Sequence, residues 1–327
     1  MMSIRAAAIA ALSIMATSIS TSPAFAHCYV GGRFFPAMLA TDDPCVADEL
    51  SLPTVSVFNT ADDPPSSQVT VAGEFSKRIT PTLGISIGST WTQINPPGQP
   101  GVAGFQNLET TFKWQFGTIP EREFVMSAGI GVEWGGTGSQ AVGAESFSTY
   151  TPTVWFGKGL GDLPDSLKWL RPFAVTGQVG YAIPGVTTMV TGIDPDSGNL
   201  TTQTNPQSVR WGASLQYSMP YLKSNVVDFG IPEFFNRMIF IVETSMQTPI
   251  ANTQDSGILT TGTINPGIIW IGRSYQFGVE AIVPVNRASG SSVGVIAQLH
   301  IYLDDLFPGS IGKPLFGGSG MARRMGY

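Results

Sequence analysis

The sequence contains little charge. Asp, Glu, Lys and Arg make up 12% of the 327 residues, which is about half the share found in a typical soluble protein. A soluble chain of this length would need more charge on its surface, whereas a membrane barrel keeps charge out of its lipid-facing belt. The scarcity therefore disfavours a soluble secreted β-protein.

The sequence also lacks what most enzymes and metal sites need. It has two histidines and two cysteines, too few for a structural zinc site unless carboxylates fill in. No glycine-rich stretch is followed by the Lys-Ser/Thr of a phosphate loop. A membrane hydrolase would need a nucleophile, a base and an acid, and the sequence does not place Ser218 or Asp304 beside His300. We expect no enzyme, no cofactor and no metal.

No segment beyond the N-terminus is an apolar run long enough for a spanning helix. The N-terminus itself reads as a secretory signal, with Arg5, a short apolar run at 6–15 and an A-x-A cleavage site at 24–26. The mature chain would begin at His27. Its net charge of −6 would become −7, because Arg5 is the one charged residue of the signal, and this argues against nucleic acid as a partner.

Two features near the expected mature N-terminus, His27 and the two cysteines, each allow two interpretations. A free amine and the imidazole of His27 can chelate copper, although such a site usually takes a second histidine and only His300 is available. The other reading is that His27 merely marks where the peptidase cuts. Cys28 and Cys45 are predicted to form a disulfide in an oxidising periplasm and to pin the N-terminal segment; the alternative is a redox or metal role.

What the sequence has in abundance is short amphipathic strands. In one of them Phe173, Val175, Val179, Tyr181 and Ile183 share a face opposite small or polar residues, as side chains alternate along a strand. Each segment is long enough to cross a bilayer as a tilted strand of about ten residues. We count twelve such segments, near 53–60, 67–78, 82–94, 105–117, 122–135, 147–159, 171–184, 206–219, 236–248, 260–272, 274–286 and 292–304.

Aromatic residues recur near the ends of these segments, as in the interfacial girdles of outer-membrane barrels: Trp91, Trp114, Phe116, Trp134, Tyr181, Trp211 and Tyr275. The connections alternate in length, which fits long extracellular loops and short periplasmic turns. The long ones are 61–66, 95–104, 136–146, 185–205 and 249–259, and the tight ones are 79–81, 118–121 and 273. Two connections break the rule: 160–170 reads as a short amphipathic helix begun by Asp165 or Ser166, and 221–235 contains Pro232. The fold class expected is an all-β, antiparallel transmembrane barrel of about 12 strands with one short periplasmic helix.

The signal, the twelve-strand pattern and the stretch 157–181 (GKGLGDLPDSLKWLRPFAVTGQVGY) resemble a family of proteobacterial outer-membrane barrel transporters of phenol-degradation pathways. The family is distantly similar to the fatty-acid and aromatic-hydrocarbon uptake barrels. The resemblance covers roughly residues 50–307 and carries no catalytic signature. It implies passage of small, often apolar or aromatic molecules across the outer membrane. The N-terminal segment has no counterpart in the resemblance. In the fatty-acid uptake barrels an N-terminal segment fills and gates the lumen, and our hypothesis is that Arg33, Phe34 and Phe35 do similar work here.

Charged residues on the predicted inward faces are the candidates for tuning which solutes pass. They are Glu74, Arg78, Glu109, Lys113, Glu133, Arg210, Glu243, Glu280, His300 and Asp304. The alternative is that they form ion pairs that hold a narrow lumen shut. The N-terminal segment has an alternative too, a short lead-in pinned to the barrel rim.

These observations predict a signal peptide at 1–26, an N-terminal segment at 27–52, a barrel at 53–304 and a periplasmic tail at 305–327. The expected location is the outer membrane of a Gram-negative bacterium after Sec-type export. The function expected is passive uptake or efflux of a small solute through a channel. The alternative is a structural or assembly barrel that presents its loops or tail to an envelope partner. Membrane lipid, the solute and the barrel-assembly machinery are the partners expected, and nucleic acid is not.

Overall fold

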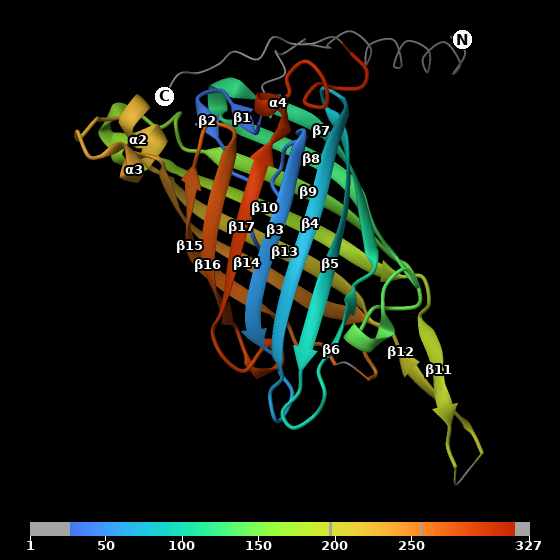
Figure 1. Cartoon of the computed structure of the whole chain (residues 1–327). Helices are drawn as coiled ribbons and strands as arrows, with labels where there is room; N and C mark the ends of the chain where they lie inside the picture. Colours follow the sequence, from blue (N-terminus) through green and yellow to red (C-terminus); the bar gives the residue numbers. More distant parts are fainter. Residues whose placement is uncertain (1–26, 196–197, 256, 318–327) are drawn as a thin grey trace, which may run out of the picture.

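The computed structural model describes residues 27–195, 198–255 and 257–317. The predicted signal at 1–26 and the last ten residues of the predicted tail lie outside the described residues. The described chain forms a closed antiparallel barrel (Figure 1), in which β4 pairs with both β3 and β5 and closes the sheet. Twelve strands make the wall, because β6 and β7 both pair with β5 and together occupy one position in it.

All twelve predicted strands are present, with edges that shift by a few residues. The first wall strand begins earlier than predicted, and the strand predicted at 105–117 is interrupted between β6 and β7. The wall strands are β3 (Glu49–Asn59), β4 (Ser67–Thr80), β5 (Leu83–Asn95), β6 (Val102–Phe105), β7 (Leu108–Ile119), β8 (Phe124–Trp134), β9 (Thr149–Gly159), β10 (Phe173–Pro184), β13 (Gln207–Ser218), β14 (Met238–Ala251), β15 (Thr261–Ile271), β16 (Tyr275–Pro284) and β17 (Gly294–Tyr302).

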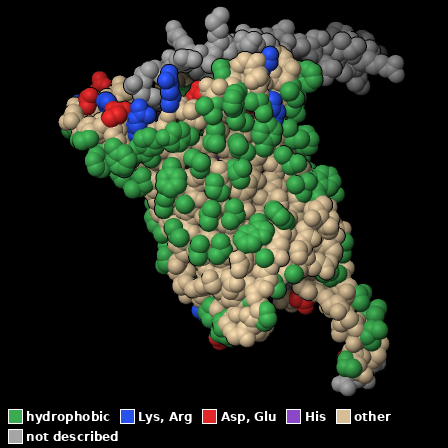
Figure 2. All heavy atoms as spheres, viewed as in Figure 1, with side chains coloured by type: hydrophobic (Ala, Val, Ile, Leu, Met, Phe, Trp, Pro, Cys, Tyr) green, Lys and Arg blue, Asp and Glu red, His purple; other side chains and the backbone are tan. Residues whose placement is uncertain are grey.

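Large apolar side chains cover the outside of the wall (Figure 2). They come from alternate positions of the strands, as the period of two predicts, and they include Phe112, Val179, Leu215, Phe240 and Phe277. This belt matches the lipid-facing surface of outer-membrane barrels. None of the helices in the described part of the chain is long and apolar enough to cross a membrane.

Apart from the two helical connections at 160–172 and 219–237, the connections sort by length to the two ends of the barrel (Figure 1). We call the end with the tight turns the periplasmic end, since short turns face the periplasm in such barrels. The long connection at 185–205 contains a hairpin that the sequence did not predict, formed by β11 (Thr188–Ile193) and β12 (Leu200–Thr204), which projects from the opposite end. A short 3-10 helix, η2 (Gln140–Val142), lies in another long loop.

The periplasmic end carries more helical structure than the single helix predicted. The predicted helix is a 3-10 helix, η3 (Asp165–Leu170), which begins at the predicted Asp165. The connection at 221–235 is also helical, because Ser218 caps a first helix and Pro232 precedes a second. The short helices at this end are η1 (Pro120–Arg122), η3, α2 (Met219–Asn225), α3 (Glu233–Asn236) and α4 (Leu303–Leu306), and η4 (Arg287–Ser289) lies in a loop at the other end.

Residues 27–48, which we call the lumen segment, fold back into the periplasmic half of the barrel (Figure 1). They contain the small hairpin of β1 (Tyr29–Val30) and β2 (Arg33–Phe34), and a disulfide joins Cys28 to Cys45. Opposite this segment, the wall has apolar side chains that point inward. A water-filled barrel without such a segment would carry polar side chains there. Phe34, Met38 and Leu39 pack in one buried cluster with Ile239, Ile241, Ile269 and Ile271.

Candidate functional site

The lumen segment is attached to the wall through one carboxylate above all. Glu243 on β14 is fully buried, and its Oε1 accepts a hydrogen bond from the backbone N–H of Leu39 at 2.8 Å. Its Oε2 accepts three more, from the backbone N–H of Ala40 at 3.1 Å and from the N–H and hydroxyl of Thr41, each at 2.8 Å. A carboxylate that accepts several backbone N–H groups makes strong charge-assisted bonds. Glu243 therefore fixes the bend at Leu39–Thr41.

Polar side chains of neighbouring strands complete this attachment. Gln276 accepts from the Ala37 N–H at 3.2 Å and donates to the Ala37 carbonyl at 2.6 Å, which imitates a strand pairing. Lys113 on β7 forms an ion pair with Asp42 at 2.7 Å and donates to the Asp43 carbonyl at 2.8 Å. The backbone of the segment thus finds partners inside the lumen, as buried backbone groups must.

The periplasmic end of the segment is held by ion pairs. The Arg33 guanidinium is buried, lies 3.1 Å from Glu123 in the turn after η1, and donates to the carbonyls of Arg171 and Pro172. Its plane covers the ring of Tyr221 at 3.7 Å. Each of its three nitrogens therefore makes a positioning contact, and the buried Arg33 side chain lines neither lumen cavity described below.

A second set of ion pairs joins the end of the segment to the tail. Asp48 lies 2.5 Å from Lys77 and 2.7 Å from the Arg78 guanidinium. Lys77 also donates to the carbonyls of Ile311 and Lys313 in the tail. Residues up to 317 therefore fold across the periplasmic mouth.

His27 joins the start of the lumen segment to α4. Its imidazole lies 3.1 Å from Asp304 and 2.7 Å from Asp305, and its backbone N–H donates to Asp304 at 3.0 Å. Burial lowers the pKa of His27, but the two carboxylates raise it more, to about 9. Burial alone would raise the pKa of Asp304, but His27 and Arg78 lower it below its usual value. The ligand atoms of His27, Asp304 and Asp305 lie within 4.8 Å of one another, and the ion pairs account for this spacing. The second histidine considered for a copper site, His300, has other partners.

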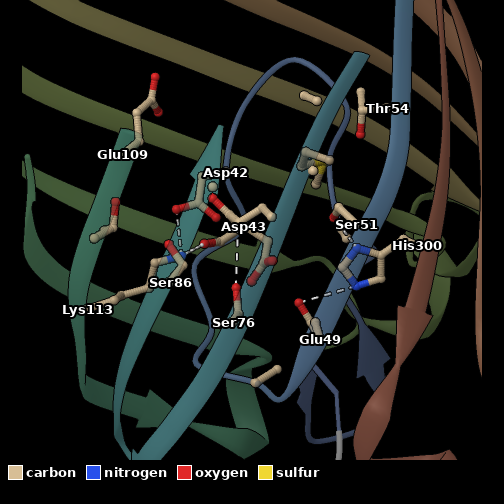
Figure 3. Close-up of a pocket in the computed structure, with 18 of the residues that line it drawn as sticks. Asp42, Asp43, Glu49, Ser51, Thr54, Ser76, Ser86, Glu109, Lys113 and His300 are labelled. Atoms are coloured by element: carbon tan, nitrogen blue, oxygen red, sulfur yellow. Dashed lines mark hydrogen bonds and ion pairs between the residues drawn. The ribbon is translucent and has the colours of Figure 1, made fainter. Parts of the chain in front are cut away.

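Beyond the segment, the lumen contains a cavity of about 250 Å³ (Figure 3). One side is the segment itself, at Asp42 and Asp43, and the other is the wall, at Glu74, Glu109 and Lys113. Burial is the main reason that the pKa of Asp43 lies well above its ordinary value. The lining of this cavity is polar and contains more acidic than basic side chains.

A second cavity, of about 220 Å³, shares Asp42, Glu74 and Glu109 with the first. Its other charged lining groups are Glu133 and Arg210. The indole of Trp155 also lines it, held by a hydrogen bond from its Nε1 to Gln178 at 3.0 Å. Lys113 Nζ lies 4.8 Å from the centre of this ring, which shows that the ring face accepts a cation.

His300 lies at the edge of the first cavity, between two residues of β3 (Figure 3). Its Nδ1 lies 2.7 Å from the Ser51 hydroxyl and its Nε2 lies 3.3 Å from Glu49. Neither Ser218 nor Asp304 is a partner of His300. The hydrolase triad considered from the sequence is therefore not assembled. The contact joins β17 to β3, which pair at this point with a register shift.

The ten predicted lumen residues fall into three groups. Glu74, Glu109, Lys113, Glu133, Arg210 and His300 line the two cavities. Glu243 and Glu280 are buried side by side beneath the lumen segment. Arg78 and Asp304 are buried at the periplasmic end, 3.6 Å apart, and Asp304 belongs to α4 rather than to the last strand. Of the three predicted plug residues, Phe34 and Phe35 pack in the two apolar clusters of the segment and Arg33 forms the ion pair described above.

Several site residues were missed from the sequence. Asp42, Asp43 and Glu49 line the first cavity, and Trp155 and Gln178 line the second. The inward-facing glutamines offered a signal, since a long amide on a small polar face needs a partner inside the barrel. Trp155 gave none, because an aromatic residue in a strand is expected on the lipid face.

Comparisons with known proteins identify the fold and no closer relationship. No protein-family model matches the chain, and no curated protein matches its sequence. Among solved structures, the COG4313 outer membrane channel from Pseudomonas putida F1 aligns with a TM-score of 0.50 and 11% identity, covering 82% of this chain and 99% of that one. The NanC porin aligns at 0.44 and 9%, and the KdgM porin at 0.42 and 10%, each covering 76% of this chain and 98% of the other. The fold is that of an outer-membrane β-barrel. The resemblance to barrels of phenol-degradation pathways stays a prediction.

Proposed function

We propose that the protein is an outer-membrane channel that passes a small solute by diffusion, and that the lumen segment is its plug. The observation that carries this proposal is the attachment of Leu39, Ala40 and Thr41 to the single carboxylate of Glu243. These bonds are strong together, and they are non-covalent. A plug can therefore be held and released without any nucleotide or cofactor.

The way the segment is divided supports a gating role. Its disulfide and the Arg33 ion pair lie at the periplasmic end, where they keep the segment folded and tethered. Residues 37–43 contact the wall through hydrogen bonds to Gln276, Glu243 and Lys113 and through the apolar packing of Met38 and Leu39, with no covalent link. We infer that this bend moves and that the disulfide-closed base stays in place.

The charges of the cavities support a polar, positively charged solute over an apolar one. Five carboxylates line the two cavities (Asp42, Glu49, Glu74, Glu109 and Glu133), against Lys113 and Arg210 as permanent cations. Asp43 is left out of this comparison, because burial raises its pKa well above the ordinary value. Acidic rings in a pore favour cations. An apolar solute would have to displace water from these carboxylates without replacing its hydrogen bonds, which is costly.

A second candidate function is a barrel that presents a surface to an envelope partner. The projecting hairpin of β11 and β12 favours it, because Val190, Ile193 and Leu200 are 58%, 66% and 63% exposed on a ribbon beyond the wall. This function would need no open lumen.

Recording in planar bilayers separates the two candidates. The channel proposal predicts brief openings of the wild type and long openings of a variant with a weakened plug. A protein that inserts, migrates on gels as a folded heat-modifiable barrel and never conducts in either form would leave the surface-presenting barrel as the better reading.

A further inference from the structure

A cluster of apolar side chains lies exposed at the periplasmic end, outside the barrel wall. It belongs to η3, α2, α3 and the connection at 226–232, which together we call the shelf. Its exposed fractions run from 43% to 60%, high values for rings and aliphatic chains of this size: Leu167, Trp169, Leu170, Phe229, Phe234 and Phe235.

The aromatic rings of the shelf continue the lipid-facing belt. Phe234 packs edge-on against Phe235 at 5.4 Å and lies 6.2 Å from Trp270 on β15. Trp270 in turn lies 5.9 Å from Tyr275 on β16. On the η3 side, Trp169 stacks on Phe229 at 6.1 Å. The apolar surface therefore passes from the wall onto the shelf.

The other side of the shelf is charged. Glu233 accepts ion pairs from Lys223 at 2.8 Å and from Arg237 at 3.2 Å. In Figure 2 charged side chains gather along the top of the projecting part of the molecule where α2 and α3 lie in Figure 1, and apolar side chains lie beneath them, next to the wall. The shelf is thus amphipathic, with its apolar side turned toward the level of the membrane.

The shelf is fixed in this orientation by buried contacts. Tyr221 and Leu222 of α2 are buried, and the Tyr221 ring lies under the Arg33 guanidinium. The indole Nε1 of Trp270 donates to the Phe234 carbonyl at 3.1 Å. The rings are therefore held outward on an ordered scaffold.

We propose that the shelf is an interfacial anchor that lies on the periplasmic leaflet of the outer membrane. Its rings enter the boundary between phospholipid head groups and acyl chains, and its charged side faces the periplasm. An amphipathic element with aromatic and leucine residues on one side and charges on the other has this preference. Phospholipid is the occupant because the apolar side continues the lipid-facing belt of Phe240 and Phe277. The anchor does not depend on whether the lumen conducts.

Site-directed fluorescence in nanodiscs tests the anchor. An introduced cysteine is the one free thiol of the chain, because Cys28 and Cys45 are its only two cysteines and are joined in a disulfide. A polarity-sensitive label is attached in Phe229→Cys and in Phe234→Cys, and in Glu121→Cys on the exposed turn η1 as the control. The nanodiscs contain phosphatidylethanolamine and phosphatidylglycerol, with or without brominated acyl chains.

The expected result is that brominated lipid quenches the labels at positions 229 and 234 and aqueous iodide does not, whereas position 121 shows the reverse. Iodide quenching at 229 and 234 as strong as at 121 would overturn the proposal. Protection from iodide without quenching by brominated lipid would also overturn it and would indicate a second copy of the chain on this surface. Heat-modifiable migration checks that each variant is folded. If Phe234→Cys fails this check, position 229 still decides, because Phe229 lies between the helices and its ring packs against Trp169 alone among the described rings.

Discussion

Replacing Glu243 should loosen the plug, and the size of the effect follows from its four hydrogen bonds. Glu243→Gln keeps the shape of the side chain but removes the charge and one acceptor oxygen. The amide will turn its oxygen toward Ala40 and Thr41, which supply three donors. The Leu39 N–H, whose bond to Oε1 is 2.8 Å long, then faces an NH₂ group.

A hydrogen bond to a charged group contributes roughly 1.5–3 kcal/mol, and a buried donor left without a partner costs about 1–3 kcal/mol. Only part of this contribution is lost, because the amide oxygen keeps the contacts to Ala40 and Thr41 as neutral hydrogen bonds. We therefore expect a net loss of about 1–2 kcal/mol in plug docking, or roughly a 5- to 30-fold rise in the ratio of open to closed states. Glu243→Ala removes all four acceptor contacts, and a net loss of about 4 kcal/mol would raise that ratio roughly a thousandfold.

Single-channel recording measures this ratio directly. Glu133→Gln is the matched control, because Glu133 lines the second cavity and accepts from Asn107 of the wall at 3.2 Å. Its substitution removes an equal charge from the lumen and leaves the Leu39–Thr41 bend attached. Equal open-to-closed ratios in Glu243→Gln and Glu133→Gln would refute the assignment of Glu243 as the plug latch.

Four further predictions concern the ends of the segment and the cavity. The contribution of His27 to the free energy of unfolding, roughly 3 kcal/mol, should be fully present below pH 6.5, the ordinary value, and should disappear as the pH rises to about 9. Guanidinium unfolding from liposomes should show this loss as a difference between the wild type and His27→Gln that shrinks from pH 6.5 to about 9; two parallel profiles would contradict the ion pair. The double variant Cys28→Ser, Cys45→Ser should lower the free energy of unfolding by about 3 kcal/mol, because the disulfide closes a loop over a sequence separation of 17. Protease should then cleave the variant within 29–44. Resistance equal to that of the wild type would mean that the wall contacts alone hold the segment. Arg33→Met should lower stability by roughly 3–5 kcal/mol, because it leaves Glu123 buried without its cation, and an unchanged temperature of heat-modifiable migration would show that Glu123 finds another partner. Glu109→Gln with Glu133→Gln should lower the ratio of cation to anion permeability, while Asp62→Asn in an exposed loop should leave it unchanged; equal effects would place the selective charges outside the cavities.

The sequence was sufficient for the wall because each strand carries its own signal. Alternation of residues such as Val175 and Thr176 reports two environments, lipid and lumen, and needs no knowledge of neighbouring strands. The hairpin of β11 and β12 was missed because both of its faces meet solvent, so its pattern of threonines gives no period. The helices α2 and α3 were missed because they are too short for a helical period to show.

The site could be predicted only in part. The inward face of Glu243 follows from strand parity, but its partners are backbone groups of Leu39, Ala40 and Thr41, more than 200 positions away. Nothing in local sequence encodes such a contact. The inward direction of Ile239 and Ile269 was also not predictable from local sequence, because apolar residues of a barrel strand are expected to face lipid. They face inward here because they pack on the apolar side chains of the lumen segment.

The reversal potential of the open wild-type channel across a gradient of KCl tests the central claim most directly. With five carboxylates besides the buried Asp43 against two permanent cations around the cavities, the account predicts a potential displaced toward the equilibrium value for potassium. A potential displaced toward the value for chloride, or no current at any voltage from protein shown to be inserted and folded, would contradict it.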